Sequence, residues 1–266
     1  MPVQPDVVVA STLYDPDARL LPFLRDGDIP RVLLETFPRV AVECSDSTSP
    51  KVVSYLRQAG LTVAVCRGHR IVDEYQMILK QTRQALEPGQ RLAYVDFDRL
   101  AHWIARYPEE LAETLAQALD LEYLHMGRTR RASATRSPTQ QETESTVNAF
   151  VARIEGYEAM CDTISVCWVF SKPLLERLLR QEMRTLMGFY AAWPVFLWGW
   201  AETKHYVEVE GLEWETPDRF RAEIAELEYD AWLDQFESPA EWRRRVACMN
   251  DCLEELASLS RMTLTP

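Results

Sequence analysis

The sequence predicts an α/β fold with a mostly parallel central sheet flanked by helices, followed by a helical C-terminal region. Four continuous apolar runs, each bounded by polar turns, lie within the first 100 residues, and helical patterns separate them. Continuous apolar runs are typical of strands buried on both faces. Strands that alternate with helices form parallel, doubly wound sheets through right-handed crossovers.

The N-terminal elements follow one another without a long linker. The predicted strands lie at residues 7–10, 40–44, 61–66 and 92–95. A helix opens at Ser49-Pro50 and ends at Gly60, since proline suits the first turn of a helix and glycine the position after the last. A second helix, with apolar residues at helical spacing, runs from Ile71 to Leu86, before Pro88-Gly89.

The pattern changes after residue 100. We expect helices from Pro108, from Pro138 and from Lys172, and a final helix from Ser238-Pro239. The predicted strands are 122–126, 164–170 and 206–210, and residues 127–146 form a polar loop that leads into a helix. Because no internal repeat or linker is visible, we predict one domain over 1–266, divided into 1–100, 101–236 and a C-terminal helix at 237–266.

Composition restricts the possible partners. The formal net charge is −12 and the pI is about 4.9, which argues against nucleic-acid binding. No apolar run reaches the length of a membrane span and the N-terminus lacks a signal-peptide pattern, so we expect a cytoplasmic protein. The six cysteines lack the spacing of a zinc site, and we expect buried free thiols. The sequence leaves homo-oligomerisation open.

Two acids follow the fourth predicted strand in LAYVDFDRL. Asp96 and Asp98 lie at the carboxyl end of that strand, where open α/β sheets bind ligands. Carboxylates at i and i+2 can converge on a hard divalent ion such as Mg²⁺ or Mn²⁺, which substrate phosphates complete. A strand end exposed to water is the alternative.

The first 100 residues resemble the nucleotide-sugar-binding half of glycosyltransferases with a GT-A fold, especially the large inverting family 2. The first strand ends in a short polar loop at 11–15. The second ends in an acid and a Ser/Asp/Thr-rich turn, in VAVECSDSTSP, and the third leads to a loop with Gly68. The fourth ends in the D-x-D signature. The resemblance implies a GT-A-like (Rossmann-like) fold, with the nucleotide sugar on 1–100 and the acceptor on 101–236.

The resemblance also implies roles for particular residues. Asp96 and Asp98 would bind Mg²⁺ or Mn²⁺ on the donor diphosphate, with His205 as a third ligand. A surface or core histidine is the alternative for His205. The residues that resemble the lining of the nucleoside pocket are Thr12, Glu43, Asp46 and Arg70. The implied function is metal-dependent transfer of a sugar from a nucleotide-diphosphate donor to an unknown acceptor, which could be a small molecule, a glycan or a lipid-linked group.

The acceptor half holds the remaining candidates. In the basic stretch RTRRASATR we expect Arg128 or Arg131 to bind a phosphate, and pairing with surface acids is the alternative. An inverting transfer needs a general base. Asp162, among apolar neighbours that would raise its pKa, is the first candidate, with Glu142 and Glu144 as rivals. The aromatic segment 189–202 predicts core packing, with one or two rings lining the acceptor cleft.

Three other functions fit parts of the pattern. Sugar-phosphate nucleotidyltransferases carry a glycine-rich basic loop after the first strand, which 12–16 lacks. Haloacid-dehalogenase-type phosphatases place Asp-x-Asp after the first strand rather than the fourth. A non-catalytic GT-A-like binding domain is the third alternative, because the Glu-Asp pair that usually carries the base is not visible.

Overall fold

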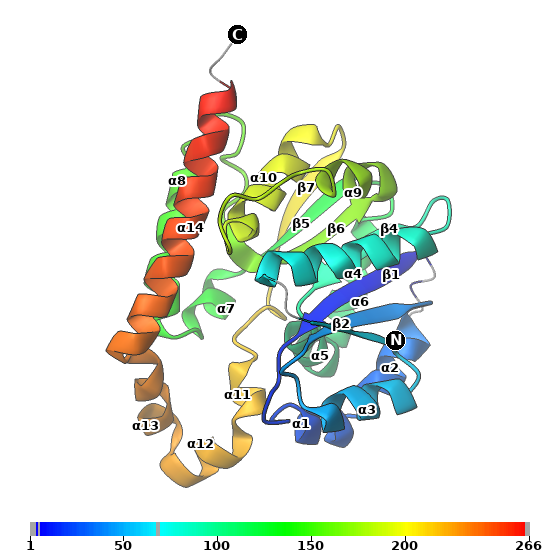
Figure 1. Ribbon diagram of the computed structural model, residues 1–266, viewed down its shortest axis with the longest axis vertical. Helices are drawn as coiled ribbons and strands as arrows, with labels where there is room; N and C mark the ends of the chain where they lie inside the picture. The colour runs from blue at the N-terminus through cyan, green and yellow to red at the C-terminus, as the bar shows by residue number, and fades with distance from the viewer. Residues whose placement is uncertain (1–3, 5, 68–69, 264–266) are drawn as a thin grey trace.

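One sheet of seven strands forms the centre of the computed structural model, which describes residue 4, residues 6–67 and residues 70–263 (Figure 1). Within these residues the strand order is β3-β2-β1-β4-β6-β5-β7. Only β6 runs antiparallel to its neighbours β4 and β5. The strands are β1 (Val7–Leu13), β2 (Val40–Ser45), β3 (Thr62–Cys66), β4 (Arg91–Val95), β5 (Tyr123–Arg128), β6 (Cys167–Ser171) and β7 (Lys204–Val209). The predicted fold class is confirmed.

The N-terminal half alternates strands and helices as predicted. Its helices are α1 (Leu21–Asp26), α2 (Ile29–Thr36), α3 (Pro50–Gln58) and α4 (Ile71–Ala85). Gly60 follows α3 with φ +100°, a conformation that favours glycine. The helices α1 and α2 were not predicted. The loop residue Gly68 lies outside the described residues.

The part of the chain from Phe97 to Trp200 is mostly helical. It contains α5 (Phe97–Arg106), α6 (Pro108–Gln117), α7 (Arg130–Ala134), α8 (Pro138–Val151), the 3₁₀ turn η1 (Thr163–Ser165), α9 (Lys172–Leu178) and α10 (Phe189–Trp200). The helices predicted from Pro108, Pro138 and Lys172 are confirmed. The strand predicted at 164–170 begins only at Cys167, because Val166 has the left-handed conformation, with φ +57°.

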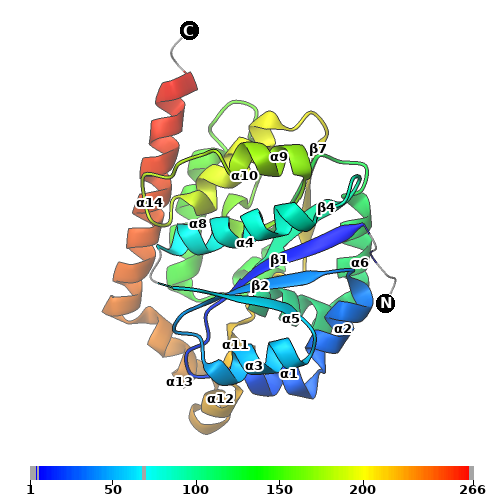
Figure 2. The same ribbon diagram turned by 45° about the vertical axis from the view of Figure 1, so that its right-hand side comes forward.

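The C-terminal region that follows β7 is helical. It consists of α11 (Thr216–Arg219), α12 (Arg221–Leu227), α13 (Tyr229–Leu233), η2 (Asp234–Glu237) and α14 (Pro239–Thr263). The long helix α14 packs along α8 and against α10, as Figures 1 and 2 show. Trp214, Phe220, Trp232 and Phe236 form an aromatic cluster that holds the short helices together.

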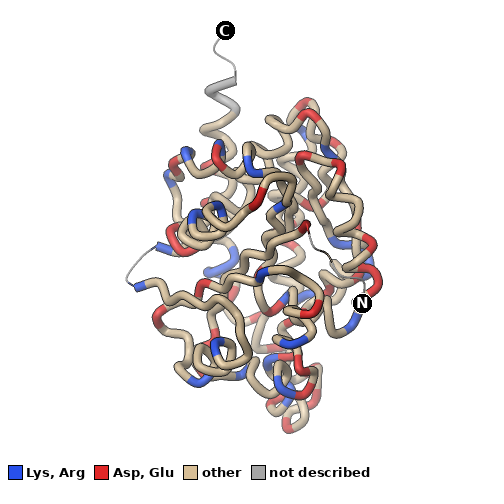
Figure 3. Tube along the Cα trace, turned by 90° about the vertical axis from the view of Figure 1, so that its right-hand side faces the viewer, with Lys and Arg blue, Asp and Glu red and all other residues tan. Residues whose placement is uncertain are grey.

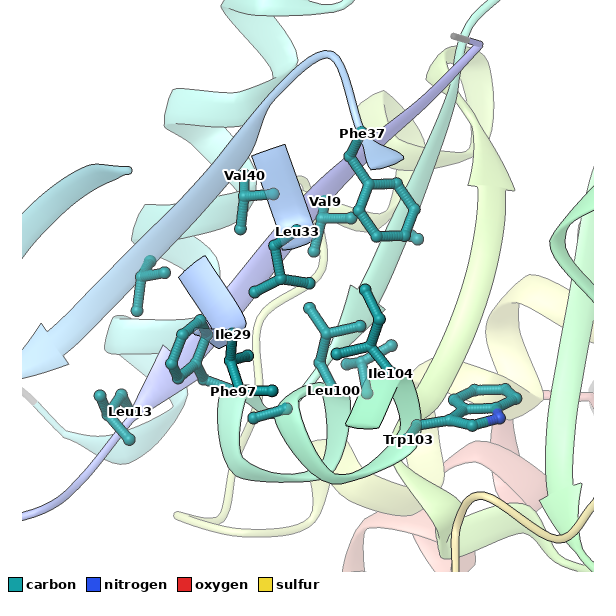
Figure 4. Close-up of a cluster of buried hydrophobic side chains, with 14 of the residues drawn as sticks. Val9, Leu13, Ile29, Leu33, Phe37, Val40, Phe97, Leu100, Trp103 and Ile104 are labelled. Atoms are coloured by element: carbon teal, nitrogen blue, oxygen red, sulfur yellow. The ribbon is translucent and has the colours of Figure 1, made fainter. Parts of the chain in front are cut away.

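Apolar side chains cover both faces of the sheet, as continuous apolar strands require. On one face, α1, α2, α3, α5 and α6 pack against residues such as Val9 and Val40 (Figure 4). On the other, α4, α8, α9, α10 and α14 pack against residues such as Tyr94 and Trp168. The aromatic segment forms α10, and Trp193 is fully buried in this second core, as the sequence predicts.

The surface is mixed in charge. Acidic and basic residues are interspersed along the chain trace, as Figure 3 shows. Among the described residues, each helix is either too short or too polar to cross a bilayer. All six cysteines are free, and Cys161 is the exposed exception to the predicted burial.

We expect Leu100→Ala to lower the free energy of unfolding by about 2–5 kcal/mol, because Leu100 is 1% exposed and fills the core between α5 and the sheet. Urea denaturation of both proteins measures the difference. Leu34→Ala is the matched control, since Leu34 is 36% exposed. Equal losses for the two variants would contradict this assignment of the core.

Candidate functional site

A cavity of about 150 Å³ lies at the edge where β4 and β5 end. Because β4 and β5 both pair antiparallel with β6, their carboxyl ends reach the same edge. The walls come from α4, α5, α8, η1, α10 and α14 and from residues beside them. Its ionisable lining residues are Asp96, Arg99, Glu144, Tyr190, Arg244, Arg245 and Cys248. We call this space the edge cavity.

Asp96 precedes α5 and presents its two oxygens to different partners. Its Oδ1 accepts hydrogen bonds from the hydroxyls of Tyr75 and Tyr94, both at 3.0 Å, and from Thr12 at 3.3 Å. Its Oδ2 lies 3.6 Å from Nη1 of Arg99, one helical turn later. The three hydroxyls occupy one oxygen and fix the carboxylate, while the other oxygen faces a cation.

Asp98 lies in the first turn of α5 and pairs with α11. Its Oδ2 is 3.3 Å from Nη1 of Arg219. The Nη2 of Arg219 donates to the carbonyl oxygen of Tyr14 at 2.6 Å and lies 3.4 Å from Oδ1 of Asp15, which is fully buried. Burial, followed by repulsion from Glu215, raises the pKa of Asp98 to about 6. Arg219 therefore ties α11 to the ends of both β1 and β4.

These residues do not fit the divalent metal that the resemblance implies. Magnesium needs only one or two carboxylates when substrate phosphates complete its shell. Here, however, Asp98 already pairs with a guanidinium, and one oxygen of Asp96 accepts three hydroxyls. No group of three His, Cys, Asp or Glu side chains that could hold a metal occurs in the described part of the chain.

His205 does not join the two aspartates. It lies exposed on β7, which is three strands away from β4, or roughly 14 Å at the usual strand spacing. The pairing register aligns His205 with Leu124, near the start of β5, whereas Asp96 follows the end of β4. The structure thus supports the alternative of a surface histidine.

The predicted nucleoside-pocket residues are only partly brought together. Thr12 donates to Asp96, and Glu43 is its neighbour across the β1–β2 register. The Glu43 side chain lies buried under α4, where Gln81 donates to it at 3.2 Å, and burial raises its pKa to about 7. Asp46 is exposed in the turn after β2. Arg70 precedes α4, is half-exposed and pairs with Asp73 at 3.1 Å.

The raised pKa predicted for Asp162 does not agree with its surroundings in the structure, where its pKa is lowered. Arg128 donates to Asp162 from its backbone nitrogen at 2.9 Å and from Nε and Nη2 at 2.5 and 2.6 Å, and Asn148 adds a fourth bond. Burial opposes ionisation, but attraction to Arg128 outweighs it and holds the pKa of Asp162 well below its usual range. A carboxylate held in this way accepts a proton poorly.

The side chain of Arg128 is likewise engaged in buried ion pairs, with Asp162 and Glu144. Its side chain is 2% exposed, and its third nitrogen donates to Glu144. The predicted phosphate contact would have to break a buried ion pair. Arg131 is half-exposed on α7 and pairs with Glu210 and Glu213, as the alternative of pairing with surface acids proposed.

Of the predicted bases, only Glu144 lines the edge cavity. Its Oε1 accepts a hydrogen bond from Gln140 at 2.8 Å. Burial opposes its ionisation, but attraction to Arg128 and Arg136 lowers its pKa. Its rival Glu142 is exposed on the other side of α8.

A buried charge network that the sequence analysis missed connects these groups. Arg136, 3% exposed, lies 3.6 Å from Glu144 and 3.7 Å from Glu215, and none of its side-chain nitrogens has a hydrogen-bond partner among the described residues. Burial, with repulsion from Arg128, lowers its pKa to about 9. Glu215 also lies 3.8 Å from Arg99. The sequence contained a hint that Arg99 and Arg136 belong to the site, since Arg99 directly follows the D-x-D sequence and Arg136 lies in the basic stretch. It contained no such hint for Arg219.

Comparisons with known proteins find similarity at a low level. No protein-family model matches the chain, and no curated protein matches its sequence. The structure of S. aureus TarS 1–349 is similar at 13% identity, over 97% of this chain and 73% of that one, with a TM-score of 0.45. M. tuberculosis glucosyl-3-phosphoglycerate synthase is similar at 10% identity, over 77% and 71%, with a TM-score of 0.44.

A complex of the same synthase with Mn²⁺, uridine diphosphate and phosphoglyceric acid is similar at 11% identity, with a TM-score of 0.39. That match covers 64% of this chain and 57% of the other, so this chain corresponds to a little over half of the synthase's length there. Similarity at this level concerns the path of the chain. The function proposed below therefore rests on the side chains of this protein.

We expect Arg128→Gln to lower the free energy of unfolding by about 3–5 kcal/mol, because it leaves the buried carboxylate of Asp162 without its partner. Chemical denaturation at neutral pH measures the loss. Arg131→Gln breaks two ion pairs of a half-exposed arginine and should cost no more than about 1 kcal/mol. Similar losses for both variants would show that the Arg128 pair is not buried in solution.

We expect Asp98→Asn to become more stable relative to the wild type as the pH rises from about 4 to 7. The folded-state pKa of about 6 lies above the ordinary value of 3.8, so ionised Asp98 disfavours the folded state. The destabilisation of the wild type by ionised Asp98 is absent at a pH below the ordinary pKa of 3.8 and reaches its full size at a pH above the folded-state pKa. Denaturation curves over this pH range measure it, and a constant difference between the two proteins would contradict the raised pKa.

Proposed function

We propose that this protein is a glycosyltransferase that transfers a sugar from a nucleotide-diphosphate donor to a small acceptor. One observation carries the proposal. The edge cavity joins Asp96 of the D-x-D sequence with basic side chains from opposite walls, Arg99 on α5 and Arg244 and Arg245 on α14. It lies at the carboxyl ends of the strands, where open α/β sheets bind ligands.

The size and charge of the edge cavity support this assignment. Sites that enclose drug-sized ligands usually measure about 300–1,000 Å³. At about 150 Å³, the cavity suits the sugar and the reacting part of the acceptor rather than a complete nucleotide sugar. Three arginines and two carboxylates line it, which favours an anionic group. Val166, with its left-handed backbone, lies in the wall, and strained residues often concentrate at functional sites.

Each of the charged side chains at the edge cavity has a role in the proposed transfer. The bond between the sugar C1 and the diphosphate oxygen breaks with its electron pair on that oxygen, and the acceptor hydroxyl oxygen bonds to C1. The hydroxyl proton passes to Glu144, which is ionised at neutral pH and lines the cavity. Arg99 stabilises the charge that develops on the departing diphosphate. Asp96, fixed by three hydroxyls, orients Arg99.

A second candidate is a GT-A-like domain that binds its ligand without catalysis. The observation that favours it is the pairing of Glu144 with Arg128, since a base with a lowered pKa removes a proton less readily. Binding without turnover would distinguish this function from transfer.

We expect one or more nucleotide-diphosphate sugars to raise the melting temperature of the protein in a thermal-shift screen. Arg245→Gln should reduce the shift, because it removes a cation from the cavity wall. Arg243→Gln is the matched control, since Arg243 is exposed on the same helix and does not line the cavity. If no nucleotide sugar shifts the melting temperature, or both variants respond alike, the proposal is wrong.

Detection of released nucleoside diphosphate then separates the two functions. Transfer predicts release that Glu144→Gln lowers by about 10²–10⁴-fold, the usual contribution of general base catalysis. Binding of the nucleotide sugar without any release would favour the non-catalytic domain.

A further inference from the structure

We propose that Arg219, with Arg99, supplies at the D-x-D sequence the positive charge that a divalent ion was expected to supply, so that the donor diphosphate binds without metal. The part that concerns the diphosphate rests on the proposed function. The part that concerns the metal rests on the two aspartates alone.

Arg219 lies between Asp98 and the turn that follows β1. Its guanidinium contacts Asp98 through Nη1 and the turn after β1, at Tyr14 and Asp15, through Nη2. It thus bridges the carboxyl ends of β1 and β4, where the resemblance places the donor diphosphate. The side chain is 18% exposed and has contacts on two sides, so the cation is held in place.

Both arginines have a nitrogen that makes no hydrogen bond. The Nε atoms of Arg219 and Arg99 are buried and have no hydrogen-bond partner among the described residues, although Nε of Arg99 lies 3.8 Å from Oε1 of Glu215. A buried donor without a partner is costly, and native proteins usually satisfy such groups with water or a ligand. Guanidinium groups present several donors in a planar fork that matches phosphate oxygens.

Each guanidinium bridges two carboxylates. Asp98 and Asp15 face Arg219, and Asp96 and Glu215 face Arg99. A divalent ion bound to Asp98 would have to displace Arg219 from this position and break both of its ion pairs. Binding of the diphosphate by arginine avoids that cost, and arginine stabilises the corresponding charge in phosphoryl transfer.

Mn²⁺ alone tests the metal part. We expect 1 mM Mn²⁺ to leave the melting temperature of the wild type unchanged and to raise that of Arg219→Gln, in which Asp98 has lost its cation. The matched control is Arg221→Gln, whose arginine is 43% exposed and pairs with Asp26 and Asp218. This control should respond like the wild type. A clear shift in the wild type would overturn the inference.

Calorimetry with uridine and guanosine diphosphate tests the donor part. We expect the better ligand to bind the wild type with equal affinity in EDTA and in Mn²⁺, and Arg219→Gln to bind at least about tenfold more weakly in EDTA, since a charge-assisted hydrogen bond contributes about 1.5–3 kcal/mol. Binding only with Mn²⁺ would overturn the inference and leave the proposed function standing. No binding in either buffer would remove the proposed function, and the Mn²⁺ measurement would still decide the metal part.

A second variant, Arg219→Lys, tests the donor part even if Arg219→Gln does not fold. Arg219→Lys keeps the charge but not the fork, so we expect its affinity to lie between those of the wild type and Arg219→Gln. If Arg219→Gln does not fold, the wild-type comparison in EDTA and Mn²⁺ and the Arg219→Lys affinity decide. Affinity of Arg219→Lys equal to that of the wild type would argue against guanidinium recognition of the diphosphate.

Discussion

Buried charges must be paired, and this constraint shapes the whole carboxyl edge of the sheet. Arg128 and Asp162 join β5 to the turn before β6, and Glu144 connects that pair to α8. Arg219 fastens α11 to the first turn of α5 through Asp98 and to the turn after β1 through Tyr14 and Asp15. The aromatic cluster around Trp232 and the ion pair of Arg219 together hold α11 in place. The edge cavity itself is lined by residues of α5, α8, α10 and α14, among which the Glu144 pair fixes α8.

The strands were predictable because their signal is local. Runs such as 7–10 and 92–95 are short and apolar throughout, and polar turns bound them, which is typical of strands covered on both sides. Helices α1 and α2 lack such a marker, and α5 was missed because it begins within the D-x-D sequence itself. Asp98 thus belongs to a helix rather than to a strand end.

The errors in the site have a common physical cause. The pKa of Asp162 was predicted from its apolar neighbours, whereas Arg128, 34 positions away in the sequence, reverses the shift. Asp98 likewise meets Arg219, 121 positions away. A charge partner at such a separation cannot be read from local composition. The sequence therefore predicted which residues gather at this edge better than which partner each would have.

The position of α14 has a consequence for substrate range. One wall of the edge cavity comes from this last helix, through Arg244, Arg245, Cys248 and Met249. None of these residues belongs to the sheet or to α5, where the D-x-D sequence lies. Changes in the bulk or polarity of α14 can therefore alter the shape of the edge cavity while the sheet and α5 keep their framework. Under the proposed function, such changes would be a route by which substrate preference diverges without a change of fold.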